Sequence, residues 1–168
     1  VIYREAKLDY TPKTDCDPET EKKRFDDALE RFFEKNEQLR EHVGQTAGEA
    51  AAKIILGHIM MMKDPYMISE IGKLIDGGAS AETAVGTVCD MFVTVFASSD
   101  DEITSQRATD VKDVKNEILA LLLGAETHDL SALPENTVLV VKELTPSMTA
   151  RIDTDNVVGF ITEVGSKN

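Results

Sequence analysis

Helical periodicity dominates this sequence between residues 17 and 124. Apolar residues recur there every three or four positions, which is the spacing of one face of an α-helix. Signals for helix starts and stops divide the stretch into five helices. Starts are expected at Asp17-Pro18, near Thr46, and at Asp64-Pro65, Ser80 and Asp100 to Glu102. Stops are expected at Gly77-Gly78 and Gly124. Because the connections are short, neighbouring helices should be antiparallel and form a bundle of two helical hairpins.

The residues after Pro134 have a different pattern, typical of an α/β domain. Residues 137–141 are rich in β-branched side chains, a short helix should begin at Thr145-Pro146, and residues 157–161 read as a second, buried strand. A strand, helix, strand order predicts that the two strands are parallel.

Parallel strands need further strands beside them, and VIYREA at residues 1–6 is the remaining candidate. We therefore predict an α+β fold in which a helical domain is inserted into an α/β domain. The expected boundaries are 1–16 and 125–168 for the two pieces of the α/β domain, whose sequence ends look incomplete, and 17–124 for the helical domain.

The acidic charge of the chain restricts its partners. Lysine and arginine number 18 against 31 acidic residues, which gives a net charge of −13. No basic run of the kind that binds phosphate groups is present, so neither nucleic acid nor an anionic membrane is an expected partner. An acidic surface would speed the encounter with a basic protein. It would also simply keep a protein soluble, and both interpretations remain open.

The two cysteines, Cys16 and Cys89, belong to no metal-binding or redox motif. We expect free thiols in a reducing compartment, which indicates a cytoplasmic protein. No apolar run approaches the roughly 18 residues that a membrane helix needs, and no segment resembles a signal peptide.

Common nucleotide, zinc-protease and hydrolase motifs are absent, and the three histidines, His42, His58 and His128, are scattered. His58 is flanked by an apolar helix face, where packing is a more frequent role than catalysis. The run Met60-Met61-Met62 is more informative, because on a helix it spreads over nearly a full turn and at least one side chain must leave the core. Methionine suits adaptable protein-binding surfaces, but gap filling between helices is an equal alternative.

Four stretches in this order give the chain a resemblance to a known family: "GHIMMMKDP" at 57–65, "DDEITSQRATDVKDV" at 100–114, "LTPSMTA" at 144–150 and "GFITEVGSKN" at 159–168. Together they resemble the N-terminal region of the Enzyme I family, the phosphoenolpyruvate-protein phosphotransferases of the bacterial sugar phosphotransferase system. The resemblance runs from about residue 20 to the end of the sequence.

The resemblance implies a swivelling α/β phosphohistidine domain with a helical insertion that docks the small phosphocarrier protein HPr. Members of this family take phosphate from phosphoenolpyruvate onto a histidine and pass it to HPr. Gly165 to Asn168 look like the first four positions of the family's phosphohistidine loop, so the phosphorylated histidine is expected two residues after Asn168. Magnesium, phosphoenolpyruvate binding and homodimerisation belong to a C-terminal domain of the family.

The same resemblance implies roles for individual residues. Those expected to contact HPr are Glu49, Met60, Met61, Met67, Phe96 and Arg107. Thr149 matches a threonine that hydrogen-bonds the active histidine, and Asp110 matches an acid near it. Ala50, Pro65 and Tyr66 replace acids of the family pattern, and Ser166 replaces a glycine of the histidine loop.

Two other readings compete with a phosphotransferase fragment. The chain could be a noncatalytic interaction module that kept the helical bundle, which the codons after Asn168 would decide. It could also be the phosphohistidine domain of a related dikinase or phosphoenolpyruvate synthase, although the helical insertion is not expected there.

Overall fold

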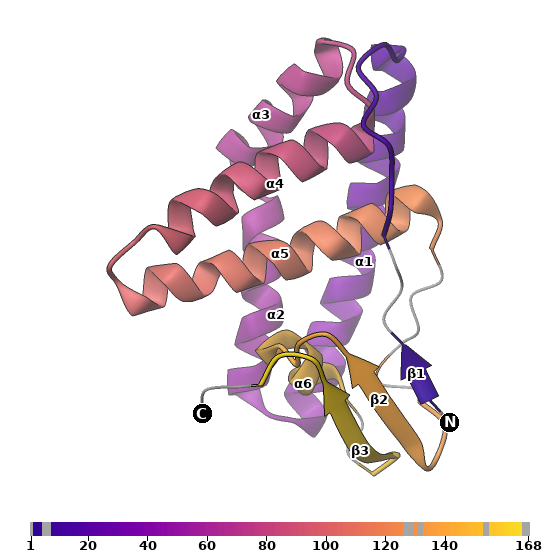
Figure 1. The fold of residues 1–168 in the computed structure, drawn as a ribbon, viewed down its shortest axis with the longest axis vertical. Helices are drawn as coiled ribbons and strands as arrows, with labels where there is room; N and C mark the ends of the chain where they lie inside the picture. The colour runs from indigo at the N-terminus through magenta and orange to yellow at the C-terminus, as the bar shows by residue number, and fades with distance from the viewer. Residues whose placement is uncertain (1, 5–7, 126–129, 131–132, 153–154, 166–168) are drawn as a thin grey trace.

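The computed structural model describes residues 2–4, 8–125, 130, 133–152 and 155–165 (Figure 1). His128 and the Ser166 to Asn168 part of the predicted histidine loop lie outside the described residues. The elements, in order, are β1 (Ile2–Arg4), α1 (Pro18–Thr46), α2 (Glu49–Met62), α3 (Pro65–Asp76), α4 (Ala81–Ala97), α5 (Glu102–Leu123), β2 (Thr137–Val141), α6 (Pro146–Arg151) and β3 (Val157–Thr162).

Capping side chains fix where most helices begin, as predicted. Asp17, Asp64, Ser80 and Asp101 each accept a hydrogen bond from a backbone N–H in the first turn of α1, α3, α4 and α5, respectively. The predicted start of α2 near Thr46 is wrong by three residues, because α1 continues to Thr46 and Gly48 turns the chain at a φ of 91°.

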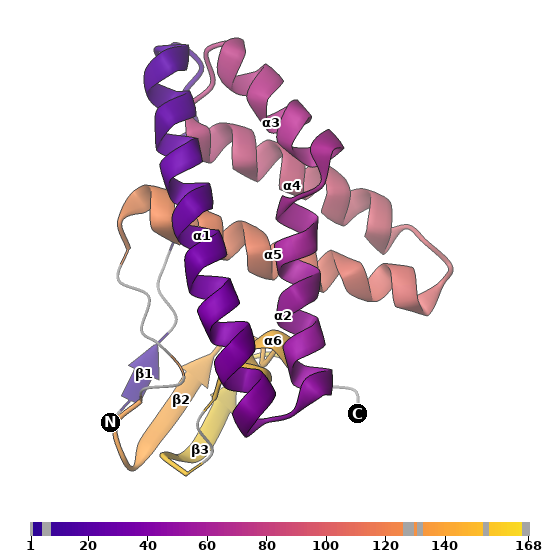
Figure 2. The same cartoon turned by 180° about the vertical axis from the view of Figure 1, so that it is seen from behind.

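The helices form two hairpins that cross. Helices α1 and α2 lie side by side along the long axis of the molecule, and the α4–α5 hairpin runs across them (Figures 1 and 2). The main core fills the space between the hairpins and α3, and its fully buried members include Phe32, Ile71, Val85 and Ile118. The predicted bundle of two helical hairpins is confirmed.

The sheet is parallel and has the order β1-β2-β3. Ile2 pairs with Val138 between β1 and β2, and Leu139 pairs with Phe160 between β2 and β3. Helices α1 to α5 therefore lie in the chain between two adjacent strands, and α6 forms the crossover from β2 to β3. The predicted α+β class, with a helical insertion in an α/β part, is confirmed.

The prediction that residues 157–161 form a buried strand is wrong on burial. Strand β3 is at the sheet edge and packs mainly against β2, and Val158, Phe160 and Ile161 are exposed. The small core of this part gathers instead around Leu139 of β2, with Leu130, Leu133 and Ile152. An apolar β-branched run predicts a strand, but it does not reveal which elements cover it.

A charged cluster ties together the start of α1, the start of α4 and the end of α5. The Arg24 guanidinium donates to the Glu21 carboxylate (Nη1 to Oε2, 2.7 Å), to the Glu82 carboxylate and to the Leu122 carbonyl oxygen (3.3 Å). The backbone N–H of Ala81 donates to Glu21 at 2.8 Å. The Glu21 carboxylate thus satisfies a free N–H at the start of α4, and the Arg24 guanidinium satisfies a free carbonyl at the end of α5.

Residues 8–16 form an extended segment that crosses the α3–α4 connection and closes one side of the core. The Lys13 N–H donates to Thr83 Oγ1 at 3.0 Å, and the Cys16 N–H donates to the Gly78 carbonyl at 2.9 Å. The Tyr10 hydroxyl occupies the place where a Cβ on Gly86 would be. A glycine at this helical position therefore serves the close approach of Tyr10.

We predict that Gly86→Ala lowers the free energy of unfolding by about 1–3 kcal/mol, because the added methyl group displaces Tyr10. In a Tyr10→Ala background the same change should stabilise by up to about 1 kcal/mol, since alanine is the better helix former. Gly72→Ala is the matched control, because a Cβ there has open space. Urea unfolding of the unchanged protein, Gly86→Ala, Tyr10→Ala and the double variant measures the coupling between the two residues. If Gly86→Ala stabilised the protein while Tyr10 is present, the packing described would be contradicted.

Candidate functional site

The three consecutive methionines at the end of α2 have different surroundings. Met62 is buried in the main core, Met61 is half-buried against it, and Met60 is 59% exposed. The prediction that at least one of them leaves the core is confirmed. Met60 and Met61 therefore bring flexible apolar side chains to the surface just before the junction of α2 with α3.

Aromatic side chains continue this surface from α3 onto α4. Tyr66, at the start of α3, is 58% exposed and meets Phe92 edge to face, with ring centroids 6.0 Å apart. Phe92 in turn lies 6.0 Å from Phe96. Such pairs are favourable beyond the area they bury. Met91 and Val95, beside the two phenylalanines on α4, are exposed.

The tip of the α4–α5 hairpin adds a further exposed apolar residue. Its tip extends past α2 and α3 (Figures 1 and 2). Ile103, in the first turn of α5, is 72% exposed, and the exposed Arg107 lies one helical turn later. We call the set Met60, Met61, Tyr66, Met91, Phe92, Val95, Phe96 and Ile103 the α2–α5 apolar surface.

Acidic residues border this surface. Asp64 lies at the α2–α3 junction, and Asp100, Asp101 and Glu102 lie at the tip of the α4–α5 hairpin; all four are exposed. A hydrogen bond from the Thr104 side chain lowers the pKa of Asp101, so its carboxylate is charged well below neutral pH. The surface is thus apolar in its middle, and its rim carries these four acids together with the exposed Lys63 and Arg107.

His58 connects α2 to α5 beneath the surface. Its Nε2 is 3.8 Å from Asp110 Oδ1. The ring is 1% exposed, and neither ring nitrogen has a hydrogen-bond partner among the described residues. His58 is thus buried in the helical part, as its apolar flank suggests, while Asp110 remains one-third exposed at the edge of α5.

The structure brings together some of the predicted site residues and separates others. Met60, Met61, Phe96, Arg107 and Asp110 lie on or beside the α2–α5 apolar surface. The prediction for Met67 is wrong, because its side chain is 3% exposed and belongs to the main core. Met67 lies two residues after Pro65, on the buried side of α3.

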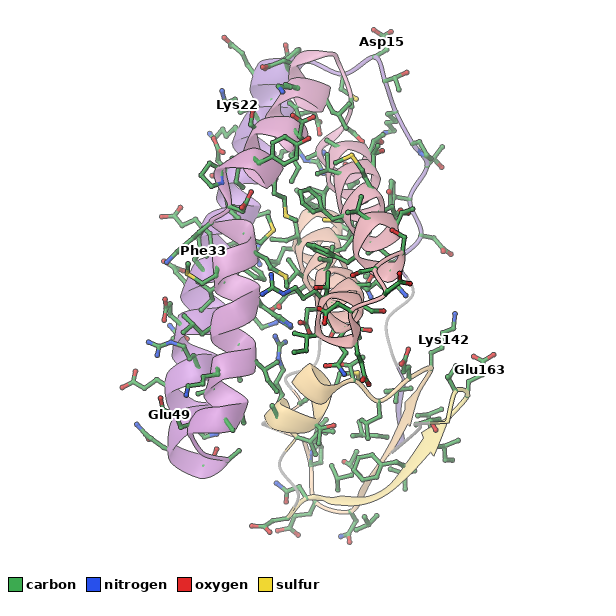
Figure 3. All side chains as sticks on the ribbon, turned by 90° about the vertical axis from the view of Figure 1, so that its left-hand side faces the viewer. Asp15, Lys22, Phe33, Glu49, Lys142 and Glu163 are labelled. Carbon is green, nitrogen blue, oxygen red and sulfur yellow. The ribbon has the colours of Figure 1, made fainter. Side chains whose placement is uncertain are left out.

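Glu49 and Thr149 lie elsewhere in the molecule. Glu49 is exposed in the first turn of α2, at the opposite end of that helix from Met60, about 16 Å along its axis (Figure 3). Thr149 is exposed on α6, which packs against α1 and α2, and its hydroxyl donates to the Thr145 carbonyl at 3.0 Å.

The sequence did not single out Tyr66, Val95 or Ile103 as surface apolar residues. Val95 belongs to the same apolar run as the buried Val88, and only the position of α4 against α3 shows which side remains open. The exposure of Ile103 could have been predicted, because Ile103 lies before Ala108, where the apolar stripe of α5 begins.

The described residues offer little chemistry of their own. Burial raises the pKa of the Cys89 thiol to about 12, so it is no nucleophile at neutral pH. Among the described residues, no three His, Cys, Asp or Glu side chains are placed to hold a metal ion. The same part of the chain contains no helix long and apolar enough to cross a membrane. The α2–α5 apolar surface itself has the exposed apolar side chains that are common in protein-binding surfaces.

Two protein-family models match parts of the chain. Residues 1–107 match the family described as PEP-utilising enzyme, N-terminal, and residues 133–168 match PEP-utilising enzyme, mobile domain. The chain is 34% identical over 164 residues to the phosphoenolpyruvate-protein phosphotransferase of Bacillus subtilis (strain 168), covering 97% of this chain and 29% of that protein. With the enzyme of Enterococcus faecalis (strain ATCC 700802 / V583) the identity is 37% over 153 residues, covering 90% and 27%.

Two solved structures share the fold. An NMR solution structure of Enzyme I has a TM-score of 0.84 and 32% identity, covering 99% of this chain and 68% of that one. The N-terminal domain of a nitrogen Enzyme 1 has a TM-score of 0.75 and 26% identity, covering 99% and 70%. The chain spans less than a third of the length of the curated relatives named above.

Proposed function

The chain belongs to the family of PEP-utilising enzymes, and we propose that it is the part of a phosphoenolpyruvate-protein phosphotransferase that docks the phosphocarrier HPr. The similarity to phosphotransferases along 97% of the chain supports this assignment. Because residues 133–168 match the mobile domain of these enzymes, we favour it over the noncatalytic module.

The observation that carries the proposal is the α2–α5 apolar surface. It carries exposed apolar side chains from four helices, among them Met60, Val95 and Ile103, and a chain of ring contacts joins Tyr66, Phe92 and Phe96. Exposed apolar residues gathered on neighbouring elements are a mark of protein-binding sites. Its acidic rim and the net charge of −13 suit a basic partner, since complementary charge steers the encounter and orients the two proteins.

In the proposed reaction the α2–α5 apolar surface holds HPr so that its histidine is aligned with the phosphorylated histidine of the phosphotransferase. The phosphoryl group would move from a histidine nitrogen of the phosphotransferase to a histidine nitrogen of HPr, so that one N–P bond breaks as the other forms. The transition state of such a transfer is loose, and the protein contributes chiefly by holding donor and acceptor in line.

Other properties of the family belong to a part of the enzyme outside this chain. We infer that phosphoenolpyruvate and Mg²⁺ bind there, and that homodimerisation also takes place there. The free thiols Cys16 and Cys89 suit a reducing compartment such as the cytoplasm.

Titration of the ¹⁵N-labelled chain with unlabelled HPr tests the proposal. We expect saturable chemical-shift changes at the ends of α2 and α4 and the starts of α3 and α5, and weaker binding at higher salt. An unrelated basic protein of similar size is the control and should cause no saturable change. Absence of any shift at millimolar HPr, or shifts confined to β3, would contradict docking at the α2–α5 apolar surface.

A further inference from the structure

A buried polar cluster lies where α6 meets the helical bundle. One nitrogen of Arg151, Nη2, donates to Asn36 Oδ1 of α1 at 3.2 Å and to Glu117 Oε2 of α5 at 3.1 Å. Lys35 Nζ of α1 lies 3.2 Å from the other oxygen of Glu117, Oε1. We call Arg151, Glu117, Asn36 and Lys35 the α6 clamp. It joins one residue of the α/β part to two helices of the bundle.

The members of the α6 clamp are held in place by their own elements. Asn36 is fully buried, and its Nδ2 donates to the Phe32 carbonyl one turn earlier at 2.9 Å. This bond fixes the orientation of the amide, so that its oxygen faces Arg151. Glu117 is also buried, on the side of α5 that faces α1.

Electrostatics keep the clamp charged at neutral pH. Burial alone would raise the pKa of Glu117, but Arg151 and Lys35 outweigh it, and the pKa is lowered. Arg151 Nε is buried and has no hydrogen-bond partner among the described residues. A buried ion pair with such desolvation costs contributes little net stability, and in some proteins buried polar groups select one geometry over others.

The clamp bridges two parts that have separate hydrophobic cores. One core lies between the two helical hairpins around Phe32 and Ile118, and the other lies around Leu139 of the sheet. No described apolar cluster spans both parts, so their relative orientation depends on the contacts of α6 with α1 and α2 and on the clamp.

We propose that Arg151 and Glu117 are positioning residues that fix the α/β part in one orientation against the helical bundle. Thr149 lies two residues before Arg151 on α6. If the proposed function holds, on which this consequence rests, the clamp keeps Thr149 at a constant place relative to the docked HPr. Removal of the clamp should loosen this relation without affecting the α2–α5 apolar surface.

Residual dipolar couplings of the aligned chain test the clamp. In the unchanged protein one alignment tensor should describe both the helical bundle and the sheet with α6. In Arg151→Met, and in the double variant Arg151→Met with Glu117→Met, the two parts should need different tensors. Hydrogen-exchange protection of α6 amides should fall by about tenfold or more. The double variant leaves no buried charge of the Arg151–Glu117 pair unpaired, and Lys35, which loses its partner, is 38% exposed. The double variant therefore stays informative if the single variant unfolds.

Lys115→Met is the matched control, because it removes an ion pair with Asp90 that lies within the helical bundle. It should leave a single tensor. An unchanged single tensor in a folded double variant would overturn the clamp proposal. HPr affinity is measured on the same samples and should be equal in all of them, whereas failure of the unchanged chain to bind HPr would overturn the proposed function alone.

Discussion

Arg24→Met should lower the free energy of unfolding by about 3 kcal/mol, because it leaves the buried carboxylates of Glu82 and Glu21 without their countercharge. The value is at the low end for a broken buried pair, since the Arg24 side chain is itself 38% exposed. The melting temperature should fall by about 6–12 °C for a chain of this size. Thermal and urea unfolding measure both quantities.

Arg40→Met is the control for this change. Arg40 lies on the same helix and pairs with Glu37 at 2.9 Å, but both side chains are more than 40% exposed. We expect a loss of no more than about 0.5 kcal/mol there. Equal losses in the two variants would show that the Arg24 cluster has no special role.

The loss caused by Arg24→Met should also depend on pH. Burial alone would raise the pKa of Glu82, but the hydrogen bond and charge of Arg24, with hydrogen bonds from the Glu82 backbone and Ser80, together outweigh it, so the pKa lies below its ordinary value of 4.5. A carboxylate with a depressed pKa contributes stability above that ordinary value, and the contribution is lost as pH falls through the depressed pKa. The difference between the unchanged protein and the variant should therefore shrink below about pH 4.5.

Val95→Lys should weaken HPr binding by about 30-fold, or about 2 kcal/mol. The added ammonium group would be desolvated against an apolar partner surface and would repel a basic partner. The helix itself should tolerate the change, because α4 has no basic residue in its last turn and a cation there complements the helix dipole. Isothermal titration calorimetry measures the affinity.

Val158→Lys on β3 is the matched control. The two valines have nearly the same exposure, 59% for Val95 and 62% for Val158, so the substitutions differ chiefly in location. HPr affinity should be unchanged in the β3 variant. Equal weakening in both variants would mean that added positive charge, and not the α2–α5 apolar surface, accounts for the loss.

Local chemistry explains why the helices could be predicted from the sequence. Asp17-Pro18 and Asp64-Pro65 carry both the capping oxygen and the fixed φ that a helix start needs, and the structure begins α1 and α3 there. Gly124 ends α5 in the left-handed conformation that favours glycine. Such signals act within one turn and need no tertiary contact.

The features that sequence reasoning missed depend on which elements pack together. Met67 follows the apolar period of α3 in the sequence, and only the position of α3 against α4 shows that it faces the core. The strand at 157–161 was predicted correctly, but its exposure follows from its edge position. Arg151 and Glu117 lie 34 residues apart and meet only when α6 docks on the bundle.

The measurement that tests the central claim most directly is an isotope-filtered NOE spectrum of the complex with HPr. The methyl groups of Met60, Val95 and Ile103 should show intermolecular NOEs to HPr. Those of Val158 and Ile161, which are also exposed, should show none. A saturated complex with NOEs from the β3 methyl groups and none from the α2–α5 apolar surface would contradict the account.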